Sequence, residues 1–239
     1  GHKVWKIAAP GLVKAIEEEF AAVPATYIAD GHHRAASAVK VGLKRRQENP
    51  GWTGKEPFNY FLSVLFPDEQ LKILPYNRVV KDLNGLTEEE FLQEAEKNFT
   101  VEFLGDRPFA PGQKGEFGMY LKDGWYKLTV HGEWLKDDPV KGLDVSILQD
   151  ALLEPVLGIK DPRTDKRIDF IGGIRGLREL ERRVKEDMEV AFSLYPTSIE
   201  ELLSVADAGL LMPPKSTWFE PKLRSGLLIH KLTEEKETR

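Results

Sequence analysis

Apolar residues recur along the chain with two spacings, one typical of helices and one typical of strands. Helical spacing, or a helix-compatible composition, predicts helices at 11–20, 35–47, 88–99, 143–157, 177–188 and 198–211. Short apolar or alternating runs predict strands at 25–29, 60–66, 71–80, 115–120, 125–130, 168–171 and 191–195. Because the two kinds of segment are interleaved, we expect an α/β or α+β fold with a mixed sheet and flanking helices.

Caps and turns indicate how several of these elements begin and join. Thr87, followed three residues later by Glu, is a capping-box pattern that predicts the start of a helix. The Asp123-Gly124 pair predicts a hairpin between its flanking strands, and a Pro-Asp-Glu turn predicts that 60–66 pairs with 71–80. Asp144 is interpreted as an early helical residue favoured by the helix dipole, with a functional role as the alternative.

We expect two lobes and a tail. Residues 1–85 are predicted to form a phosphate-binding lobe, 86–230 a second, smaller α/β lobe that contains a β-hairpin, and 231–239 a polar tail that frays. The chain does not begin with Met and enters a strand-like pattern at Lys3. We therefore expect that part of the first lobe is missing from its N-terminal side.

Composition narrows the class of protein. With 239 residues and 41% hydrophobic residues, the chain can bury a substantial core. Its formal net charge of −5 gives no general positive field for nucleic acid, and its lack of cysteine excludes thiolate catalysis and Cys-ligated metal centres. No apolar run approaches the roughly 18 residues that span a bilayer. We expect a cytoplasmic protein that acts on a small molecule and has no direct nucleic-acid or membrane partner. A homodimer is a possible assembly.

The densest group of chemically active residues is Ala-Asp-Gly-His-His-Arg at 29–34, where a predicted strand ends and a predicted helix begins. Glycine there permits a positive φ, and a helix start presents N–H groups that the helix leaves unpaired. Arg34 adds a planar guanidinium that can bind two phosphate oxygens, and His32 and His33 can each donate a hydrogen bond or take a proton. The segment predicts an anion site with phosphate as its ligand.

Asp30 has two candidate roles in such a site. A bare phosphate would repel its carboxylate, so we expect either a nucleotide-bound divalent cation between them or transfer of a proton from a reacting hydroxyl to Asp30. Asp30, His32 and His33 are therefore the predicted catalytic residues. In the structural alternative, Asp30 caps the helix, Arg34 pairs with an acidic neighbour and the histidines satisfy buried carbonyl groups.

The same segment carries a resemblance to a known family. Residues 27–36, Tyr-Ile-Ala-Asp-Gly-His-His-Arg-Ala-Ala, resemble the hallmark of a large prokaryotic family of unknown function in the ParB/sulfiredoxin-like superfamily. The likeness continues through Leu-Asp-Val-Ser-Ile-Leu at 143–148, Ala-Asp-Ala-Gly at 206–209 and Met-Pro-Pro-Lys-Ser-Thr-Trp-Phe-Glu-Pro-Lys-Leu-Arg-Ser-Gly-Leu at 212–227. Because it spans nearly the whole chain, the chain is identified as a member of that family.

The resemblance implies nucleotide chemistry. The superfamily includes sulfiredoxin, ParB and the ADP-dependent free serine kinases, which carry similar phosphate-binding loops. By this likeness Gly31, His33 and Arg34 contact a nucleotide phosphate, and ADP or ATP binds with magnesium. Asp30 then meets the metal or a hydroxyl. The sulfiredoxin cysteine position is His32 here, which excludes peroxiredoxin repair, and the acidic catalytic residue of the kinases lies in a segment that would precede this chain.

Two further segments supply candidate anion contacts. The family tends to show Pro-Thr-His-Arg where this chain has Pro-Tyr-Asn-Arg, so Asn77 and Arg78 are candidates for binding a phosphate or carboxylate. Pro214 excludes a P-loop at the following lysine because proline has no N–H to offer a phosphate. The loop around it either faces the 29–34 motif or lies in solvent, and its candidate residues are Lys215, Ser216, Thr217 and Lys222.

The leading hypothesis is a nucleotide-dependent small-molecule kinase with free serine or a similar hydroxylated metabolite as the acceptor. Arg34, His33 and the Gly31 amide would hold the donor phosphate, and Lys215 would offset the charge that develops on the transferred group. Two alternatives stay open: a non-catalytic nucleotide-binding or regulatory module, and a hydrolase whose two histidines act as acid and base. A second carboxylate that converges with Asp30 would favour transfer chemistry.

Overall fold

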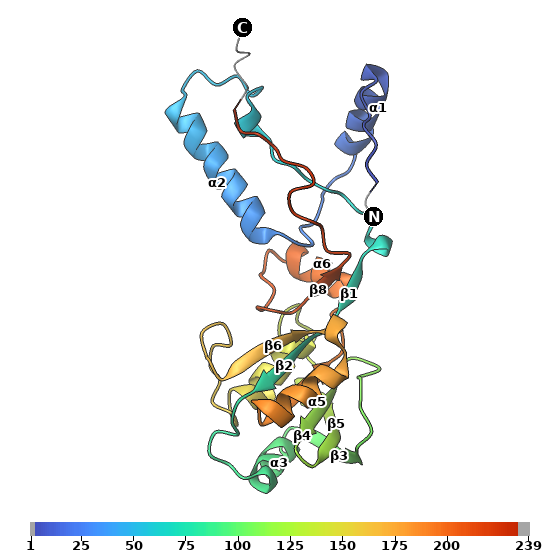
Figure 1. Cartoon of the computed structure of the whole chain (residues 1–239), viewed down its shortest axis with the longest axis vertical. Helices are drawn as coiled ribbons and strands as arrows, with labels where there is room; N and C mark the ends of the chain where they lie inside the picture. Colours follow the sequence, from blue (N-terminus) through green and yellow to red (C-terminus); the bar gives the residue numbers. More distant parts are fainter. Residues whose placement is uncertain (1–2, 234–239) are drawn as a thin grey trace. The chain divides into compact units, whose positions relative to one another are not determined.

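The computed structural model describes residues 3–233, and the predicted fraying of the tail falls mainly on residues 234–239, outside the described part. The chain divides into two compact units, Gly1–Phe61 with His230–Arg239 and Leu62–Ile229 (Figure 1). The lobe boundary expected at residue 85 falls inside the second unit, because the strand at 76–80 pairs with strands that follow it by about a hundred residues. The unit that contains the hairpin is the larger of the two.

The larger unit is built on a six-stranded sheet in the order β3-β5-β4-β7-β2-β6. Every neighbouring pair in this sheet is antiparallel, where the sequence predicted a mixed sheet. The hairpin predicted from Asp123-Gly124 is confirmed, with β4 and β5 paired from Leu121 opposite Gly124 outward. The strands are β2 (Tyr76–Val80), β3 (Phe99–Gly105), β4 (Glu116–Leu121), β5 (Gly124–Val130), β6 (Ile168–Gly172) and β7 (Val190–Leu194).

The other predicted hairpin is wrong. Residues 60–66 form no strand, and the run at 71–80 is split at Pro75 into β1 (Lys72–Leu74) and β2. A proline supplies no N–H to a ladder, so it separates the two strands. β1 pairs with β8 (Trp218–Glu220) in a small sheet of its own, while β2 joins the large sheet.

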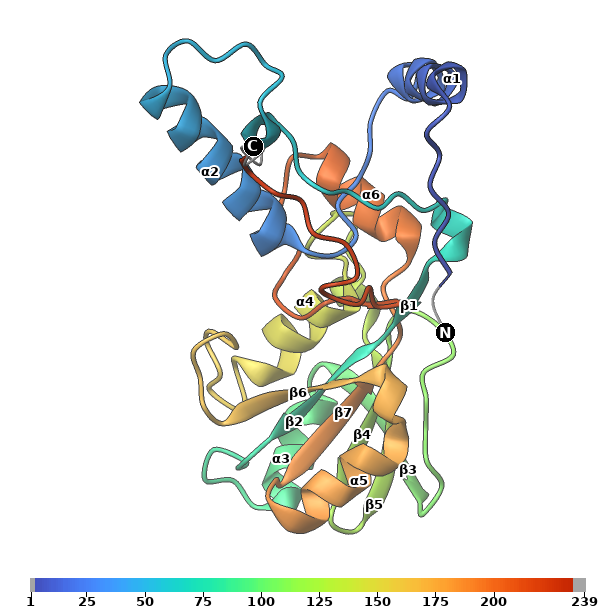
Figure 2. The same ribbon diagram turned by 45° about the horizontal axis from the view of Figure 1, so that its top comes forward.

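Helices cover both faces of the large sheet (Figure 2). On one face lie α3 (Glu88–Glu96), which begins with the predicted Thr87 capping box, and α4 (Asp144–Leu148), which continues as a π-helical turn (Gln149–Leu153). On the opposite face α5 (Leu177–Glu186) packs Leu180 and Val184 against the sheet. Side chains of β2, β4 and β7 alternate between the two clusters, as the period of two in a strand requires.

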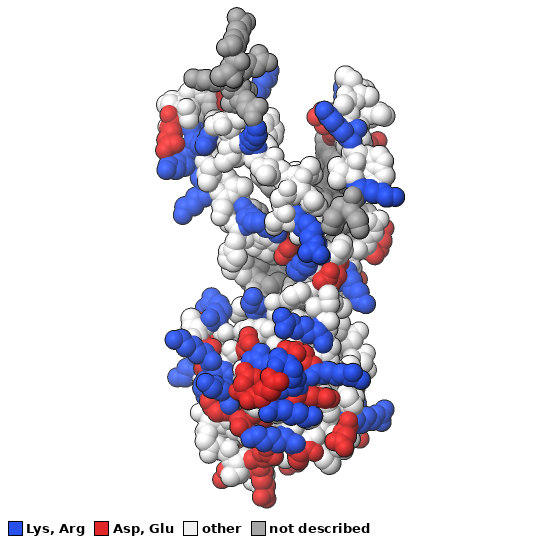
Figure 3. All heavy atoms as spheres, viewed as in Figure 1, with Lys and Arg blue, Asp and Glu red and all other residues white. Residues whose placement is uncertain are grey.

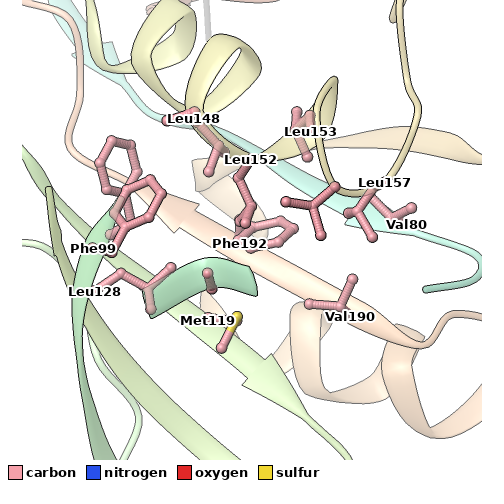
Figure 4. Close-up of a cluster of buried hydrophobic side chains, with 14 of the residues drawn as sticks. Val80, Phe99, Met119, Leu128, Leu148, Leu152, Leu153, Leu157, Val190 and Phe192 are labelled. Atoms are coloured by element: carbon pink, nitrogen blue, oxygen red, sulfur yellow. The ribbon is translucent and has the colours of Figure 1, made fainter. Parts of the chain in front are cut away.

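The main core lies between the sheet and the α3 and α4 side. In Figure 4 the side chains of Leu148 and Leu152 point from the helical layer toward Phe192 on the sheet, with Met119 on the neighbouring strand. All four side chains are fully buried. α6 (Ile199–Asp207) lies within the helix predicted over 198–211, is capped by Ser198 and adds Val205 to the same cluster.

The smaller unit holds α1 (Pro10–Ala21) and α2 (His32–Glu48), both predicted from sequence. The strand predicted at 25–29 is absent. The apolar residues of α1 have helical spacing, but no residue of α1 is buried, and Leu12 is 60% exposed. Among the described residues, the buried hydrophobic residues all lie between Val79 and Phe219, so the larger unit carries the core.

One face of the larger unit carries charges of both signs. On the face shown in Figure 3, acidic and basic side chains are interspersed over α5, where Arg182 pairs with Glu179 at 2.7 Å and Arg183 with Asp187 at 2.8 Å. This face offers no broad basic surface for a polyanion. Within residues 3–233, no helix has the length and apolar character needed to cross a bilayer.

Candidate functional site

The 29–34 motif forms a sharp bend at the start of a long helix. Gly31 is the N-cap of α2 and has φ 86° and ψ 28°, a left-handed conformation that favours glycine. A Cβ at this position would also lie 3.0 Å from Nη2 of Arg34. Although the preceding strand is absent, the backbone still makes the turn that the sequence predicted from glycine.

The N-cap of α2 is a glycine, so the N-cap residue supplies no capping side chain, and no acidic residue lies in the first turn. The N–H of Ala35 donates to the carbonyl of Gly31 at 2.9 Å, so the N–H groups of His32, His33 and Arg34 precede the helix's own hydrogen bonds. His32, His33 and Arg34 are all exposed. This 17-residue helix therefore presents amide donors and the positive end of its dipole to solvent.

Arg34 makes one of the contacts that the structural alternative anticipated. Its Nη2 lies 3.3 Å from Oδ2 of Asp30, and the two side chains are 66% and 47% exposed. An exposed pair of this kind contributes on the order of 0–1 kcal/mol, because water solvates both charges. A doubly charged phosphate can therefore compete for the Arg34 guanidinium.

Asn77 and Arg78 lie on β2 in the larger unit, and they have different surroundings. The Asn77 side chain accepts a hydrogen bond from the Leu194 N–H at 3.1 Å and thereby joins β2 to β7, so its oxygen already serves the fold. Arg78 is 4% exposed, donates to the Tyr76 carbonyl and lies over the Phe170 ring at 5.4 Å. Burial lowers the pKa of the Arg78 guanidinium to about 9.

Several side chains of the predicted basic loop around Pro214 make contacts within the larger unit. Ser216 is buried, and its hydroxyl donates to the Pro213 carbonyl at 2.5 Å. Lys215 has a φ of 56°, and its Nζ lies 5.6 Å from the Tyr76 ring centroid. Lys222 lies 5.3 Å over the Trp218 ring in the same way. These residues, with Thr217, belong to the larger unit, and the 29–34 motif belongs to the smaller one. That the loop faces the motif stays a prediction.

One titratable residue was undervalued by sequence reasoning. Asp144 is 8% exposed, its Oδ1 accepts from the Gly115 N–H at 3.0 Å, and its Oδ2 is buried with no hydrogen-bond partner among the described residues. Burial raises the pKa of this carboxyl to about 7. It lines a cavity of about 240 Å³, together with the Lys114–Glu201 ion pair at 2.6 Å. An acidic residue at the start of an apolar helical run was the available signal.

A larger cleft of about 420 Å³ was also missed, except for Arg78. Its remaining polar lining comes from α4, its π-helical turn and two loops, with Ser146, Gln149, Asp150, Lys141 and Lys160 among them. Ser146 lies in the 143–148 segment of the family likeness, but the lining residues are far apart in sequence from Arg78, so no local motif indicates that they share a cleft with it. Only the sheet topology brings them to one place.

The part of the chain that the structure describes contains no group of three or more His, Cys, Asp or Glu side chains placed to hold a metal ion. Asp30 thus stands as a single candidate carboxylate beside Arg34. That arrangement fits a magnesium ion carried by a nucleotide, which takes most of its oxygen ligands from phosphates and water and needs only one or two carboxylates. Magnesium and its contact with Asp30 stay predictions.

Comparison with known proteins identifies the family. Residues 1–146, more than half of the chain, match the family model described as a protein of unknown function, DUF1015. The chain belongs to the DUF1015 family. The matched region includes the whole Gly31 bend and Arg78, so both are part of the DUF1015 domain. No curated protein matches the chain.

Several solved structures resemble this DUF1015 protein at low identity. A free serine kinase in complex with AMP is 19% identical, with a TM-score of 0.40 over 89% of this chain and 81% of that one. A mutant of a free serine kinase in complex with ADP is 17% identical, with a TM-score of 0.40 and the same coverage of 89% and 81%. A conserved hypothetical protein from Pyrococcus furiosus is 16% identical, with a TM-score of 0.39 over 87% and 82%. At these TM-scores the likeness carries no argument about activity, and the chain's own residues are the basis for any functional proposal.

Proposed function

We propose that this DUF1015 protein is a nucleotide-dependent small-molecule phosphotransferase that binds the donor phosphate at the Gly31 bend. The observation that carries the proposal is the left-handed glycine Gly31 at the N-cap of α2, with Arg34 exposed in the first turn. Helix N-termini after a glycine bend bind phosphate because amide donors and the helix dipole act on the same anion. The ParB/sulfiredoxin-like assignment from the motif is part of the same proposal.

In the proposed site, the bound phosphate replaces Asp30 as the partner of the Arg34 guanidinium. Two oxygens of the incoming phosphate accept hydrogen bonds from the Arg34 guanidinium. The first-turn amides and His33 are further donors. Asp30 then acts on the acceptor hydroxyl or on the magnesium ion that the nucleotide brings. Since the pair is solvent-exposed, breaking it costs little compared with the charge-assisted bonds that replace it.

The proposed step is an in-line phosphoryl transfer. The hydroxyl oxygen of the acceptor, free serine or a similar hydroxylated metabolite, attacks the terminal phosphorus of ADP or ATP. The new P–O bond forms as the bond to the bridging oxygen breaks, and the departing nucleotide, shorter by one phosphate, keeps that electron pair. The hydroxyl proton passes to Asp30, while Arg34 and the amides stabilise the negative charge on the transferred group.

Calorimetric titration with ADP, ATP and CTP, with and without magnesium, tests the binding half of this proposal. We expect Arg34→Ala to weaken nucleotide binding at least about tenfold, because a charge-assisted hydrogen bond contributes roughly 1.5–3 kcal/mol. Lys40→Ala, which removes an exposed cation further along the same helix, is the matched control and should bind as the wild type does.

Binding that is equal in wild type and Arg34→Ala, or that is absent for all three nucleotides, would contradict the proposal. Phosphorus NMR of a mixture with serine then tests the chemical half by following a phosphomonoester signal. Nucleotide binding without any phosphoryl transfer would favour the alternative, a nucleotide-binding or regulatory module.

A further inference from the structure

A cleft that lies wholly within the larger unit has the features of a separate ligand site. It measures about 420 Å³, within the range of small-molecule pockets. Arg78 of β2 lines it on the sheet side, Ser146, Gln149 and Asp150 line it on the helical side, and Lys141 and Lys160 contribute from loops. None of these residues belongs to the 29–34 motif.

Arg78 is the unusual member of this cleft. Its side chain is nine-tenths buried or more, yet no carboxylate among the described residues lies within ion-pair distance of it. Nη1 donates to the Tyr76 carbonyl, the guanidinium lies over the Phe170 ring, and the Tyr76 side chain also interacts electrostatically with it. A buried guanidinium has five N–H donors, and an uncompensated buried charge is costly to the fold. The lowered pKa of Arg78 has the same cause, because burial disfavours its charged form.

The charges around Arg78 favour an anion. Arg163 and Asp161, which also line the cleft, neutralise each other through two contacts of 2.9 Å. Lys141 and Lys160 form no ion pair within the described chain, and they add positive charge to that of Arg78, although the Asp138 carboxylate partly offsets the charge of Lys141. Asp150 is the remaining carboxylate, so the lining is net positive although the whole protein is acidic.

We propose that this cleft binds a small organic anion through its carboxylate or phosphate oxygens, with the Arg78 guanidinium as the anchor and Lys141 and Lys160 as flanking cations. The planar fork of arginine suits both kinds of oxyanion, and a bound anion supplies the counter-charge that the fold does not. Apolar walls from Val145, Leu153 and the Pro213-Pro214 pair accommodate the carbon skeleton of the ligand. Ser146, Gln149 and Asp150 can bind its hydroxyl or ammonium groups.

The residues that line the cleft and the 29–34 motif have no member in common, so variants can test the two proposed sites separately. Calorimetry at constant ionic strength uses inorganic phosphate and L-malate as probes, on wild type and in an Arg34→Ala background that removes phosphate bound at the Gly31 bend. We expect saturable binding of at least one probe in both backgrounds. Phosphate binding alone identifies a phosphate ligand, and malate binding alone a carboxylate ligand.

Variants of the flanking cations keep the test valid even if Arg78 variants fail to fold. We expect the double variant Lys141→Ala/Lys160→Ala to weaken binding at least fivefold. Lys185→Ala, an exposed cation on α5 at the opposite face of the sheet, should leave binding unchanged. As a direct readout, the Nε–H resonance of Arg78 should shift on addition of the probe that binds. No saturable binding of either probe, equal binding in the double variant, or an unshifted Arg78 resonance would overturn the proposal.

Discussion

Phe192→Ala should lower the free energy of unfolding by about 3–5 kcal/mol, the usual cost of emptying a large buried aromatic site. Phe192 is 0% exposed at the centre of β7, and it belongs to the cluster that joins the sheet to the α4 layer. Two strands flank it, β2 and β4, so the surrounding backbone is held by hydrogen bonds on both sides. The cavity cannot collapse easily, which places the expected loss in the upper part of the range.

Phe103→Ala is the matched control for this prediction. It removes the same atoms from a side chain that is 56% exposed on β3, at the edge of the sheet. We expect a loss of less than about 1 kcal/mol, with its ring contact to Tyr126 as the main contribution. Urea unfolding of both variants measures the difference, and equal losses would contradict the placement of Phe192 in the buried cluster between the sheet and the α4 layer.

Asp144→Asn should change how stability depends on pH. In the native protein burial raises the pKa of Asp144 from 3.8 to about 7, whereas in the unfolded chain the carboxyl has its ordinary value. Between those values the native state holds a proton that the unfolded chain has released, so this group lowers stability as pH rises. This pKa shift lowers the free energy of unfolding by at most about 4 kcal/mol. The loss is complete above pH 7 and absent below about pH 4. Lys114 and Glu201 are the charged groups that face it.

Asparagine cannot ionise and can still accept the Gly115 N–H. We therefore expect urea unfolding to show Asp144→Asn gaining stability relative to wild type as the pH is raised from about 4 to 8. Asp138→Asn should show no such gain in this range, because the N–H groups of Lys141 and Val140 lower the pKa of that carboxyl, and its effect on stability therefore changes only below about pH 4. Parallel profiles for wild type and Asp144→Asn would show that Asp144 does not titrate in this range.

Local sequence signals predicted the elements that depend on local interactions. Thr87 with Glu90 predicted the start of α3, and Asp123-Gly124 predicted the β4–β5 hairpin, because a cap or a tight turn is decided within a few residues. The apolar run at 60–66 looked like a central strand for its composition alone. It forms none, since a strand requires a pairing partner that composition does not specify.

The features of the candidate sites also divide into those set by local sequence and those set by packing between remote segments. The Gly31 bend could be predicted, because a glycine before a helix-compatible run carries its own conformational signal. The setting of Arg78 could not, since its burial beneath the cleft depends on α4, the 160–163 loop and the Pro213-Pro214 pair. The buried Oδ2 of Asp144, which has no hydrogen-bond partner within residues 3–233, is likewise a product of packing between remote segments.

The most direct test of the phosphate-binding bend is an amide NMR titration of the protein with ADP and magnesium. We predict that the N–H resonances of His32, His33 and Arg34 move together and saturate, because these amides donate to the phosphate. The same resonances should move far less in Arg34→Ala at equal nucleotide concentration. Saturation at other residues, with the first turn of α2 unchanged, would contradict phosphate binding at the bend.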